Sequence, residues 1–472
     1  MTSSPKSPAH TINHDLIIVG GGSAGYAAAR TAEAEGANVG IIDQGPLGGL
    51  CILRGCMPTK AMLRSSDIAA LIRRASEFGL HSTDVQANLN AIIDRKNRLI
   101  KEFTDYRVEA LQHPRFTLYQ EHAHFLSPRL IQAGPYHLSA KTIIIATGSM
   151  VSHIPIPGLE EAGYLTSDDA LELRTSPHSM IVLGGGAVAM ELAQFFSRIG
   201  VKITVIQRSE HILSQVDKDL ARPVEAKLQE EGMTIYTKTS IKRVTGIPNR
   251  QKTVHFLHNG QTQQVTADII LQALGRRPNI DSLDLEAAQI VIQNKTIVVN
   301  KAMQTSQSHI FAVGDVNGLH EIVHIAIEQG EIAGWNAVHS DLPPKQYDDR
   351  LKAQVTFTDP QVASVGLSER ECKTQNIPFL VASYPFNDHG KSLCLGEIHG
   401  HVKILCHPQS GEILGGHIVG PEASELIHEL ITIMHFRGTI RDLLRIPHYH
   451  PTLAEILTYP AEELVNQLSP AS

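Results

Sequence analysis

The chain has 472 residues, enough for about three domains of roughly 150 residues each. Hydrophobic residues make up 42% and charged residues 19%, which excludes a disordered or fibrous protein. Asp and Glu number 48 against 41 Lys and Arg, and the net charge of −7 argues against a general nucleic-acid binder. Five cysteines are too few for a secreted disulfide scaffold, so we expect a reducing compartment and a cytoplasmic protein.

The beginning of the chain does not resemble a signal peptide. Residues 1–14 are polar and lack the apolar run of a signal peptide, which predicts a short disordered leader. No run of 18 or more apolar residues occurs anywhere, so we expect no membrane span and no membrane partner.

Two segments of the chain show the same order of predicted elements. In the first, a β-branched run at 15–19 meets three glycines, an alanine-rich helix at 24–37 and a strand at 39–42. In the second, a strand at 180–183 meets three glycines, a helix at 188–198 and a strand at 201–206. The repetition predicts two doubly wound, Rossmann-like α/β domains.

The remaining segments divide at two proline-containing linkers, at 155–158 and 343–344. Between the repeats we expect a buried strand at 142–146, and after Gly275 a loop-like segment followed by a strand at 309–313. The last part of the chain mixes strands at 354–358, 401–406 and 413–419 with a helix at 423–436. This mixture predicts a separate C-terminal α+β domain.

The first glycine motif, Gly20-x-Gly22-x-x-Gly25, lies between a predicted strand and a predicted helix. Its glycines allow a tight turn, close approach of a pyrophosphate and close packing of helix on strand. Asp43 follows at the end of the next strand, where a carboxylate can accept hydrogen bonds from ribose hydroxyls. The motif therefore favours a dinucleotide site, and the alternative is an ordinary glycine turn.

The second motif, Gly184-x-Gly186-x-x-Ala189, repeats the pattern but has Gln207 and Arg208 where the acidic residue is expected. An amide is a poorer partner for a ribose diol, and an arginine can pair with a 2′-phosphate. We therefore expect a nicotinamide site with a preference for NADP, the alternative being that Arg208 is a solvated surface arginine. Two such sites in one chain suggest electron transfer between two nucleotides.

Cys51 and Cys56 are five residues apart, too far for an easy disulfide on an ideal helix. Gly55 and Pro58 allow the backbone to leave that geometry, so a bridge is possible with local distortion. Pro58 suits the first turn of a helix, which would place Cys56 near a helix N-terminus and favour a reactive thiolate. The alternative is two small buried apolar residues, and the absence of a second Cys or His pair argues against a metal site.

The segment Gly48-Gly49-x-Cys51-x-x-x-x-Gly55-Cys56-x-Pro58-x-Lys60 closely resembles the redox-active segment of the class I pyridine nucleotide–disulfide oxidoreductases. That family includes dihydrolipoamide dehydrogenase, glutathione reductase and mercuric reductase. Other segments resemble the family's motifs in the same order along nearly the whole chain. They are Ala146-Thr147-Gly148, Gly275-Arg276-x-Pro278-Asn279, Gly314-Asp315, Phe357-Thr358-x-Pro360, Val362-Ala363-Ser364-Val365-Gly366 and His450-Pro451-Thr452-x-x-Glu455.

The resemblance implies an FAD-binding domain at 1–150 that continues at 280–345, an NAD(P)-binding domain at 151–279 and a dimerisation domain at 346–472 of a homodimer. The implied FAD-binding residues are Gly20, Gly22, Ser23, Ala24, Gly25, Asp43, Gly49, Cys51, Lys60, Ala123, Thr147, Gly148 and Asp315. The implied NAD(P)-binding residues are Gly184, Gly186, Ala189, Glu191, Arg208 and Gly275. No metal is expected.

The resemblance also implies a ping-pong cycle that passes electrons from NAD(P)H through FAD to a Cys51–Cys56 disulfide. Cys56 would face the flavin, and Cys51 would exchange with a small-molecule or protein-bound disulfide. His450 of the partner subunit would transfer the proton, oriented by Glu455, and a His with a nearby carboxylate suits that role. The alternative is an ordinary surface histidine. A Lys60–Glu191 pair beside the flavin would tune its electron affinity or be purely structural.

The motifs leave the branch of the family open. His450, Thr452 and Glu455 fit dihydrolipoamide dehydrogenase and glutathione reductase, whereas mercuric reductases tend to carry a tyrosine there and a C-terminal cysteine pair. We expect a dihydrolipoamide-dehydrogenase-like enzyme. The alternatives are a glutathione-reductase-like NADPH enzyme, a mercuric-reductase-like enzyme, and a flavoprotein that transfers electrons without disulfide chemistry. Arg54 departs from the usual pattern and favours an acidic thiol, while Arg30 is interpreted as a helix-surface arginine.

Overall fold

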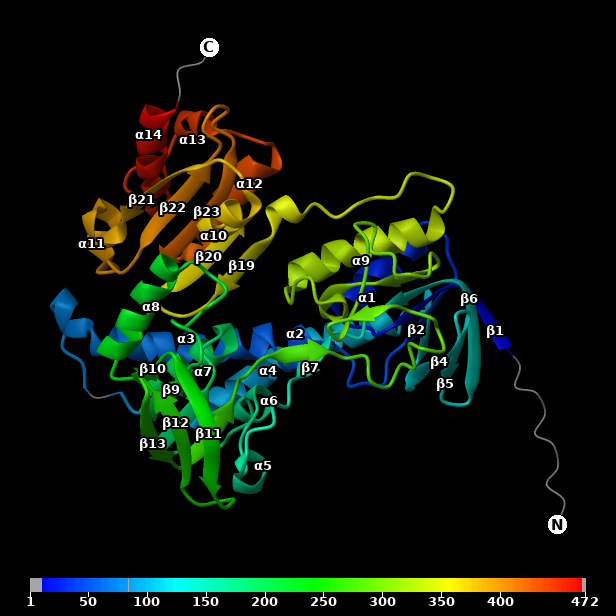
Figure 1. Ribbon diagram of the computed structural model, residues 1–472, viewed down its shortest axis with the longest axis horizontal. Helices are drawn as coiled ribbons and strands as arrows, with labels where there is room; N and C mark the ends of the chain where they lie inside the picture. The colour runs from blue at the N-terminus through cyan, green and yellow to red at the C-terminus, as the bar shows by residue number, and fades with distance from the viewer. Residues whose placement is uncertain (1–10, 84, 469–472) are drawn as a thin grey trace. The chain divides into compact units, whose positions relative to one another are not determined.

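A computed structural model describes residues 11–83 and 85–468, and the chain divides into two compact units (Figure 1). The first unit comprises the residues up to Pro58, Arg95–Ser152 and Gly275–Asp348. The second comprises Thr59–Asp94, His153–Leu274 and the residues from Asp349 onward. Two long helices, α3 (Cys56–Arg73) and α4 (Leu89–Leu111), contain the first two points where the chain passes between the units.

The first unit is built on a seven-stranded sheet of order β3-β2-β1-β6-β5-β4, with β18 also paired to β6. β1 lies parallel between β2 and β6, so that Ile18 is opposite Ile41 and Ile144, all fully buried. The strands are β1 (Thr11–Val19), β2 (Val39–Ile42), β3 (Phe116–Tyr119), β4 (Ala123–Ser127), β5 (Leu130–Ala133), β6 (Tyr136–Ile145) and β18 (Ile310–Ala312). Short strands outside this sheet are β7 (Ser149–Val151), β15 (Arg276–Pro278), β16 (Ile292–Gln293) and β17 (Thr296–Ile297).

Two helices of this unit, α1 (Ser23–Ala34) and α9 (Val323–Val338), lie side by side, as the blue and yellow-green helices of Figure 1 show. Their approach is close because two glycines of α9 face α1. A Cβ atom on Gly330 would lie 2.3 Å from the Ala24 carbonyl oxygen, and one on Gly334 would lie 2.5 Å from that of Ala28. The remaining helices of the unit are α2 (Leu50–Leu53) and the 3₁₀ turn η2 (Gly314–Asn317).

The second unit contains a four-stranded parallel sheet of order β10-β9-β8-β14 and a three-stranded antiparallel sheet of order β11-β12-β13. The strands are β8 (Ser179–Leu183), β9 (Lys202–Ile206), β10 (Thr234–Tyr236), β11 (Thr239–Gly246), β12 (Lys252–His258), β13 (Gln261–Ala267) and β14 (Ile269–Gln272). The helices of this part are η1 (Ala75–Phe78), α5 (Leu159–Ala162), α6 (Ser167–Ala170), α7 (Ala187–Arg198) and α8 (Lys218–Glu230).

The C-terminal part of the second unit is a five-stranded antiparallel sheet of order β19-β20-β23-β22-β21, one face of which packs on α12. Its strands are β19 (Ala353–Thr356), β20 (Gln361–Gly366), β21 (Leu380–Pro385), β22 (His401–Cys406) and β23 (Ile413–Gly420). Its helices are η3 (Asp349–Leu351), α10 (Glu369–Gln375), η4 (Phe386–Asp388), α11 (Gly390–Leu395), α12 (Ala423–His435), α13 (Ile440–Arg445), η5 (Leu453–Leu457) and α14 (Thr458–Gln467).

The predicted fold class, two doubly wound α/β parts and an α+β part, is confirmed, but two local predictions are wrong. Thr11–His14 belong to β1 and not to a disordered leader, because they pair with β6 from Thr11 opposite His137 onward. Residues 1–10 of that leader lie outside the described residues. The segment after Gly275 is not all loop, because β15 pairs with β7. In the described part of the chain, no helix is long and apolar enough to cross a membrane.

A buried ionic cluster joins four segments of the second unit around Arg198, at the end of α7. The Arg198 side chain is only 3% exposed, and its guanidinium donates to Glu231, to Asp67 of α3 and to Asp359 after β19. Gln194, one turn earlier on α7, exchanges two hydrogen bonds with the backbone of Asp359. Burial opposes the charged guanidinium, but Glu231 and Asp359 raise the pKa of Arg198 above its ordinary value.

We expect Arg198→Met to destabilise the second unit strongly, because it removes the enclosed cation shared by three partly buried carboxylates. Breaking a buried ion pair in this way costs about 3–5 kcal/mol, which corresponds to a fall in Tm of about 6–15 °C. Thermal unfolding followed by circular dichroism measures the change. The matched control is Arg174→Met, whose ion pair with Asp94 is exposed on both sides and is worth at most about 1 kcal/mol. Equal losses in the two variants would contradict this account.

Candidate active site

The turn between β1 and α1 has the shape of a phosphate-binding turn. A Cβ atom on Gly25 would lie 1.8 Å from the Gly20 carbonyl oxygen, so the third glycine of the motif is required by the packing of the helix on the strand. Gly22 is the N-cap of α1, and a Cβ atom there would have only the Gly49 Cα within 4 Å, at 3.7 Å. The turn therefore offers open space at the start of a helix, next to Ser23 and Ala24, where a phosphate is favoured.

The loop before Cys51 lies directly against this turn. Gly49 has a φ of +80°, and a Cβ atom on it would lie 2.7 Å from the Gly22 Cα. Only glycine fits both conditions. The structure thus brings the Gly20–Gly25 motif and the segment leading to Cys51 together within the first unit.

Asp43 is held at the end of β2 by the backbone. Its carboxylate accepts hydrogen bonds from the Gly21 N–H at 2.7 Å and from the Gly45 N–H at 2.8 Å. The side chain predicted to bind a ribose therefore touches the glycine turn itself, which fixes its direction.

Residues from three distant parts of the sequence complete the first unit's candidate site. The Ser149 hydroxyl donates to Asp315 Oδ2 at 2.6 Å, and Arg276 Nε donates to the Ser149 oxygen at 2.9 Å. Just before Gly148, the Thr147 hydroxyl donates to the Asn279 carbonyl at 2.7 Å. Asp315 is therefore hydrogen-bonded to the segment that follows β6. Ala123, another predicted residue, is buried at the start of β4. The sequence analysis named neither Ser149 nor Arg276 as a site residue, although Arg276 lies in the Gly275–Asn279 motif and Ser149 directly follows the Ala146–Gly148 motif.

Cys51 and Cys56 lie on two different helices. Cys51 is in the short helix α2, and the chain leaves helical geometry at Arg54 before α3 begins at Cys56 itself. Both cysteines are half-buried. The prediction that Cys56 lies at a helix N-terminus is confirmed, and this position favours the thiolate form.

One turn further along α3, Lys60 forms an ion pair with the buried Glu191 of α7, with 2.8 Å between Nζ and Oε2. The other carboxylate oxygen, Oε1, accepts from the Phe357 backbone N–H at 2.8 Å. The Lys60 ammonium also lies 4.5 Å from the centre of the Phe357 ring. Phe357 was predicted only as part of a motif at the start of the last domain. Its contact with both members of the pair was not visible in the sequence.

The second glycine turn, between β8 and α7, has the same glycine pattern as the first and also leaves open space at the start of its helix. Gly184 has a φ of +108°, Ala189 is buried on α7, and a Cβ atom on Gly186 would meet nothing within 4 Å. The Gln207 side chain is turned toward the turn, since a Cβ atom on Gly185 would lie 3.0 Å from it. Arg208 is exposed, which leaves its side chain available to a ligand or to solvent.

His450 and Glu455 form the pair that the sequence predicted. His450 Nδ1 and Glu455 Oε1 are 2.8 Å apart, and Oε2 accepts from the Thr452 backbone N–H at 2.8 Å. The Thr452 N–H and then the His450 ring lower the pKa of Glu455, so the carboxylate is ionised and Nδ1 must be the donor. This leaves Nε2 of an 82% exposed imidazole as the proton acceptor. The nearby His448 pairs with Glu429 instead.

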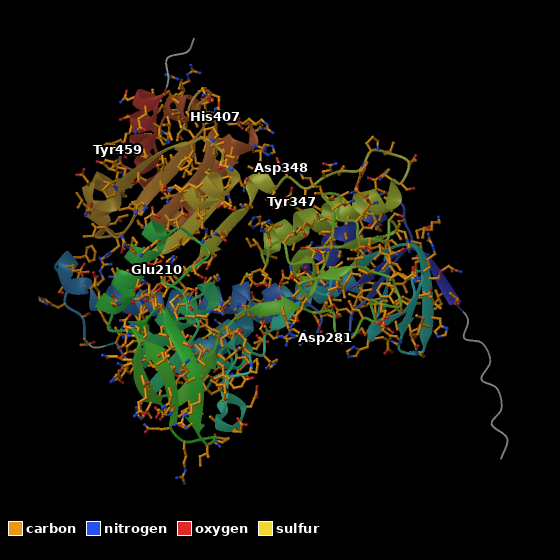
Figure 2. All side chains as sticks on the ribbon, viewed as in Figure 1. Glu210, Asp281, Tyr347, Asp348, His407 and Tyr459 are labelled. Atoms are coloured by element: carbon orange, nitrogen blue, oxygen red, sulfur yellow. The ribbon has the colours of Figure 1, made fainter. Side chains whose placement is uncertain are left out.

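A third histidine lies behind this pair and was not predicted. His389 is buried, its Nδ1 is 2.9 Å from the Ser392 hydroxyl, and its ring meets Tyr459 edge-on. Tyr459, labelled in Figure 2, also stacks on Tyr384. Burial lowers the pKa of His389, and Glu455 and His450 are among the groups that act on it. His389 is therefore a neutral neighbour of the candidate proton-transfer pair.

One group of carboxylates in the described residues has the spacing of a cation site: Asp217, Asp219 and Glu369. The ammonium of Lys403, only 2% exposed, lies among them, with Nζ 3.1 Å from Asp217, 2.8 Å from Asp219 and 3.1 Å from Glu369. A lysine thus supplies the positive charge that these acidic residues require.

The predicted site residues fall into two sets, one in each unit. The glycine turn, Asp43, both cysteines, Thr147, Gly148 and Asp315 belong to the first unit, and so does Gly275, which was assigned to the nucleotide site of the other set. Lys60, Glu191, the second glycine turn, Arg208 and the His450–Glu455 pair belong to the second unit. In the second unit the Lys60–Glu191 pair joins segments that are distant in the sequence, and the His450–Glu455 pair is a separate local contact.

Comparisons with known proteins identify the family of the chain. The family described as pyridine nucleotide-disulphide oxidoreductase matches residues 14–330, and its dimerisation domain matches residues 352–461. The chain belongs to this family. The predicted cofactors, FAD and NAD(P)H, are those of the pyridine nucleotide-disulphide oxidoreductases, so the flavoprotein assignment is confirmed.

Two curated relatives from different branches of the family have the same sequence identity to this chain. A mercuric reductase of Staphylococcus aureus is 32% identical over 430 residues, covering 91% of this chain and 78% of the relative. A dihydrolipoyl dehydrogenase of Bacillus subtilis is 32% identical over 426 residues, covering 89% of this chain and 92% of the relative. The chain is therefore a flavoprotein disulfide oxidoreductase, and equal identity to both branches does not choose between their substrates.

Among solved structures, the chain resembles the HOCl-induced flavoprotein disulfide reductase RclA from Escherichia coli in its Cu(II) complex. The TM-score is 0.83 at 24% sequence identity, and the match covers 96% of this chain and 99% of that chain. At this identity the likeness shows the fold alone.

The two glycine turns lead to a paired prediction, because Gly22 and Gly186 both have negative φ angles that alanine tolerates. An added methyl group that must be accommodated against a ligand costs about 1–3 kcal/mol, or about 5- to 150-fold in affinity. We expect Gly22→Ala to weaken FAD binding by this amount. Gly186→Ala should weaken NAD(P)H binding while leaving the bound FAD unchanged. Flavin absorbance and titration with the nucleotide measure the two effects. Loss of FAD from Gly186→Ala would contradict the assignment.

Proposed function

We propose that this chain is an NAD(P)H-dependent oxidoreductase that uses a Cys51–Cys56 redox disulfide to convert a disulfide substrate into thiols, or the reverse. The observation that carries the proposal is the placement of the two cysteines. Cys51 follows Gly49, which contacts the phosphate turn at Gly22, and Cys56 begins α3, whose next turn carries the Lys60–Glu191 pair. FAD, when bound, supplies a two-electron carrier between the nicotinamide and the cysteine pair.

We infer the division of roles from the segments that hold each residue. Segments 1–150 and 280–345 hold FAD, 151–279 holds the nicotinamide nucleotide, and 346–472 forms the dimerisation domain of a homodimer. The Gly20–Gly25 turn and α1 hold phosphates, and Asp43 orients a ribose. The corresponding residues of the second turn, together with Arg208, hold NADPH in preference to NADH. The few cysteines fit a reducing compartment such as the cytoplasm.

The two cysteines divide the thiol chemistry. Cys56 lies at the N-terminus of α3, where the helix dipole stabilises a thiolate. Cys51, on α2, is the thiol that attacks the substrate disulfide. Lys60, held by Glu191 and by the Phe357 ring, supplies a fixed positive charge one turn along the helix that begins at Cys56.

His450 and Glu455 move the proton that thiol–disulfide exchange requires. The ionised Glu455 accepts the Nδ1 proton, so Nε2 can take a proton from an attacking thiol and return it to the leaving thiolate. The imidazole is exposed, which leaves Nε2 accessible to a group outside its own domain. In our proposal that group is the Cys51 thiol of the partner subunit.

Dihydrolipoamide is the first candidate substrate, in line with the dihydrolipoyl dehydrogenases among the relatives. Glutathione disulfide or another acidic small disulfide is the second candidate, favoured by the NADPH preference that Arg208 implies. Mercuric ion is a third, from the mercuric reductases among the relatives. A turnover screen with these substrates, each with NADH and with NADPH, distinguishes them.

The redox disulfide is tested by differential labelling of the cysteines before and after anaerobic addition of NADPH. We expect Cys51 and Cys56 to accept an alkylating reagent only after reduction, as quantified by mass spectrometry. Cys394 is an internal control because it is exposed on α11 and should be labelled in both states, whereas Cys372 and Cys406 are buried and should resist. Equal labelling of Cys51 and Cys56 before and after NADPH would favour a flavoprotein that transfers electrons without disulfide chemistry.

The proton-transfer pair is tested by separating the two halves of the cycle. We expect His450→Gln to lower substrate turnover about 100-fold or more, because the proton acceptor is lost. Glu455→Gln keeps a hydrogen-bond acceptor but removes its charge, and should lower turnover about 10-fold or more. In both variants NADPH should still produce two thiols at the normal rate. A loss of thiol formation equal to the loss of turnover would contradict the assignment.

A further inference from the structure

Arg107, on α4 in the first unit, has a guanidinium that the described residues do not satisfy. Its Nε and Nη1 atoms are enclosed and have no hydrogen-bond partner in the described part of the chain. The residue as a whole is half-buried, so part of the side chain remains accessible. Enclosed donors of a charged group are expensive without acceptors, and they usually indicate that a ligand or a partner supplies them.

The side chain is positioned by an aromatic ring. Its Cζ atom lies 4.5 Å from the centre of the Tyr26 ring on α1, the helix that begins at the Gly22 turn. The Tyr26 hydroxyl accepts a hydrogen bond from Arg115 Nη2 at 3.1 Å, which holds the ring from its other end. A planar guanidinium over an aromatic face does not use its N–H groups as hydrogen-bond donors to that ring, so they can still bind an acceptor.

Other arginines around α1 have carboxylate partners, and Arg107 differs from them. Arg30 pairs with Glu331, and Arg115 lies 3.8 Å from Glu33. Within the described ranges, Arg107 forms no ion pair. A surface role of the kind predicted for Arg30 therefore does not explain Arg107.

The reactive cysteine lies within electrostatic range of this guanidinium. Burial lowers the pKa of Arg107, while Tyr26 and then Cys51 act in the opposite direction. The groups that act on it most strongly are phenols, a thiol and another arginine, and no carboxylate is among them. An arginine stays protonated even so. The enclosed guanidinium, with two donors unsatisfied in the described residues, thus lies within electrostatic range of the Cys51 thiol.

We propose that Arg107 binds a carboxylate located a few bonds from the substrate sulfur, so that the enzyme prefers small acidic disulfides. The inference rests on the proposed function and specifies its substrate class. A substrate whose carboxylate contacts Arg107 while its sulfur contacts Cys51 must carry the two groups close together. This fits the carboxylate of a small thiol acid better than the distant phosphates of a nucleotide thiol.

The chemistry of exchange is unchanged and balances. The Cys51 thiolate attacks one substrate sulfur, forming a mixed disulfide and releasing one substrate thiolate, which takes a proton from His450. The Cys56 thiolate then attacks the Cys51 sulfur of the mixed disulfide, forms the Cys51–Cys56 bond again and releases the second substrate thiolate, which takes a proton from solvent. NADPH supplies the two electrons for the next cycle. Arg107 holds the substrate carboxylate throughout and takes no part in the bond changes.

The first test uses two alkylating reagents of nearly equal size on the dithiothreitol-reduced holoenzyme. Iodoacetate is anionic and iodoacetamide neutral, and both form a C–S bond with the same thiolate and release iodide. Their rate ratio at a given cysteine therefore cancels the thiolate population and reports the local attraction for an anion. We expect the ratio to be higher at Cys51 than at the exposed Cys394, measured by mass spectrometry of the modified peptides.

Substitution then assigns the attraction to Arg107. Arg107→Met should lower the ratio at Cys51 about 10-fold or more and leave the ratio at Cys394 unchanged. Arg107→Lys keeps the charge and should fall between the wild type and Arg107→Met. The matched control Arg98→Met, an exposed arginine on the same helix, should behave as the wild type. An unchanged ratio in Arg107→Met that retains FAD and its Tm would overturn the proposal.

The second test compares disulfides that differ in charge: 3,3′-dithiodipropionate, bis(2-hydroxyethyl) disulfide and cystamine. We expect Arg107→Met to lower kcat/KM about 10- to 100-fold for the dicarboxylate only, with no loss for the neutral or cationic compound. Equal losses with all three would show a structural role and overturn the specificity. A wild type with the Arg107-dependent alkylation ratio that reduces no disulfide would refute the proposed function while supporting the anion site.

Discussion

The candidate chemistry of the second unit depends on the contacts of one buried carboxylate, that of Glu191. It joins Lys60 of α3, its own helix α7 and the backbone at Phe357, and so connects the helix that begins at Cys56 with the segment after β19. A buried charge is tolerated only when its hydrogen bonds are complete, and here both oxygens have a donor. Gln194 and Arg198 extend the same face of α7 to Asp359, so one helix face positions a whole neighbouring segment.

The cations that the fold encloses differ in the groups that compensate their charge. Around Arg198 and Lys403, a single enclosed cation is surrounded by several carboxylates, and the charges compensate one another within the protein. At Lys60 a carboxylate and an aromatic ring share one ammonium. Arg107 has only the ring, so its compensation has to come from elsewhere. The contrast distinguishes cations that hold the fold together from one that is available for recognition.

Much of this fold was predictable, because glycine motifs and hydrophobic periodicity are local signals. The strand–turn–helix units at Gly20 and Gly184 and the start of α3 at Cys56 follow from them. The extent of β1 was not predictable, because Thr11–His14 become a strand only through pairing with β6, more than a hundred residues away. The roles of Phe357, His389 and Arg107 were equally hidden. Each depends on burial and on side chains brought together by the fold, and no spacing in the sequence expresses that. The Lys60–Glu191 pair was expected only through the family resemblance.

The packing of α9 on α1 has a consequence for how variation along this chain should be interpreted. Gly330 and Gly334 rest on the backbone oxygens of Ala24 and Ala28, in the helix that starts at the first glycine turn. A single methyl group at either position must push α1 away, and with it the turn to which that helix is attached. Residues some three hundred positions apart therefore form one mechanical element. A substitution at Gly330 or Gly334, far along the chain from the first glycine turn, would therefore impair nucleotide binding at that turn.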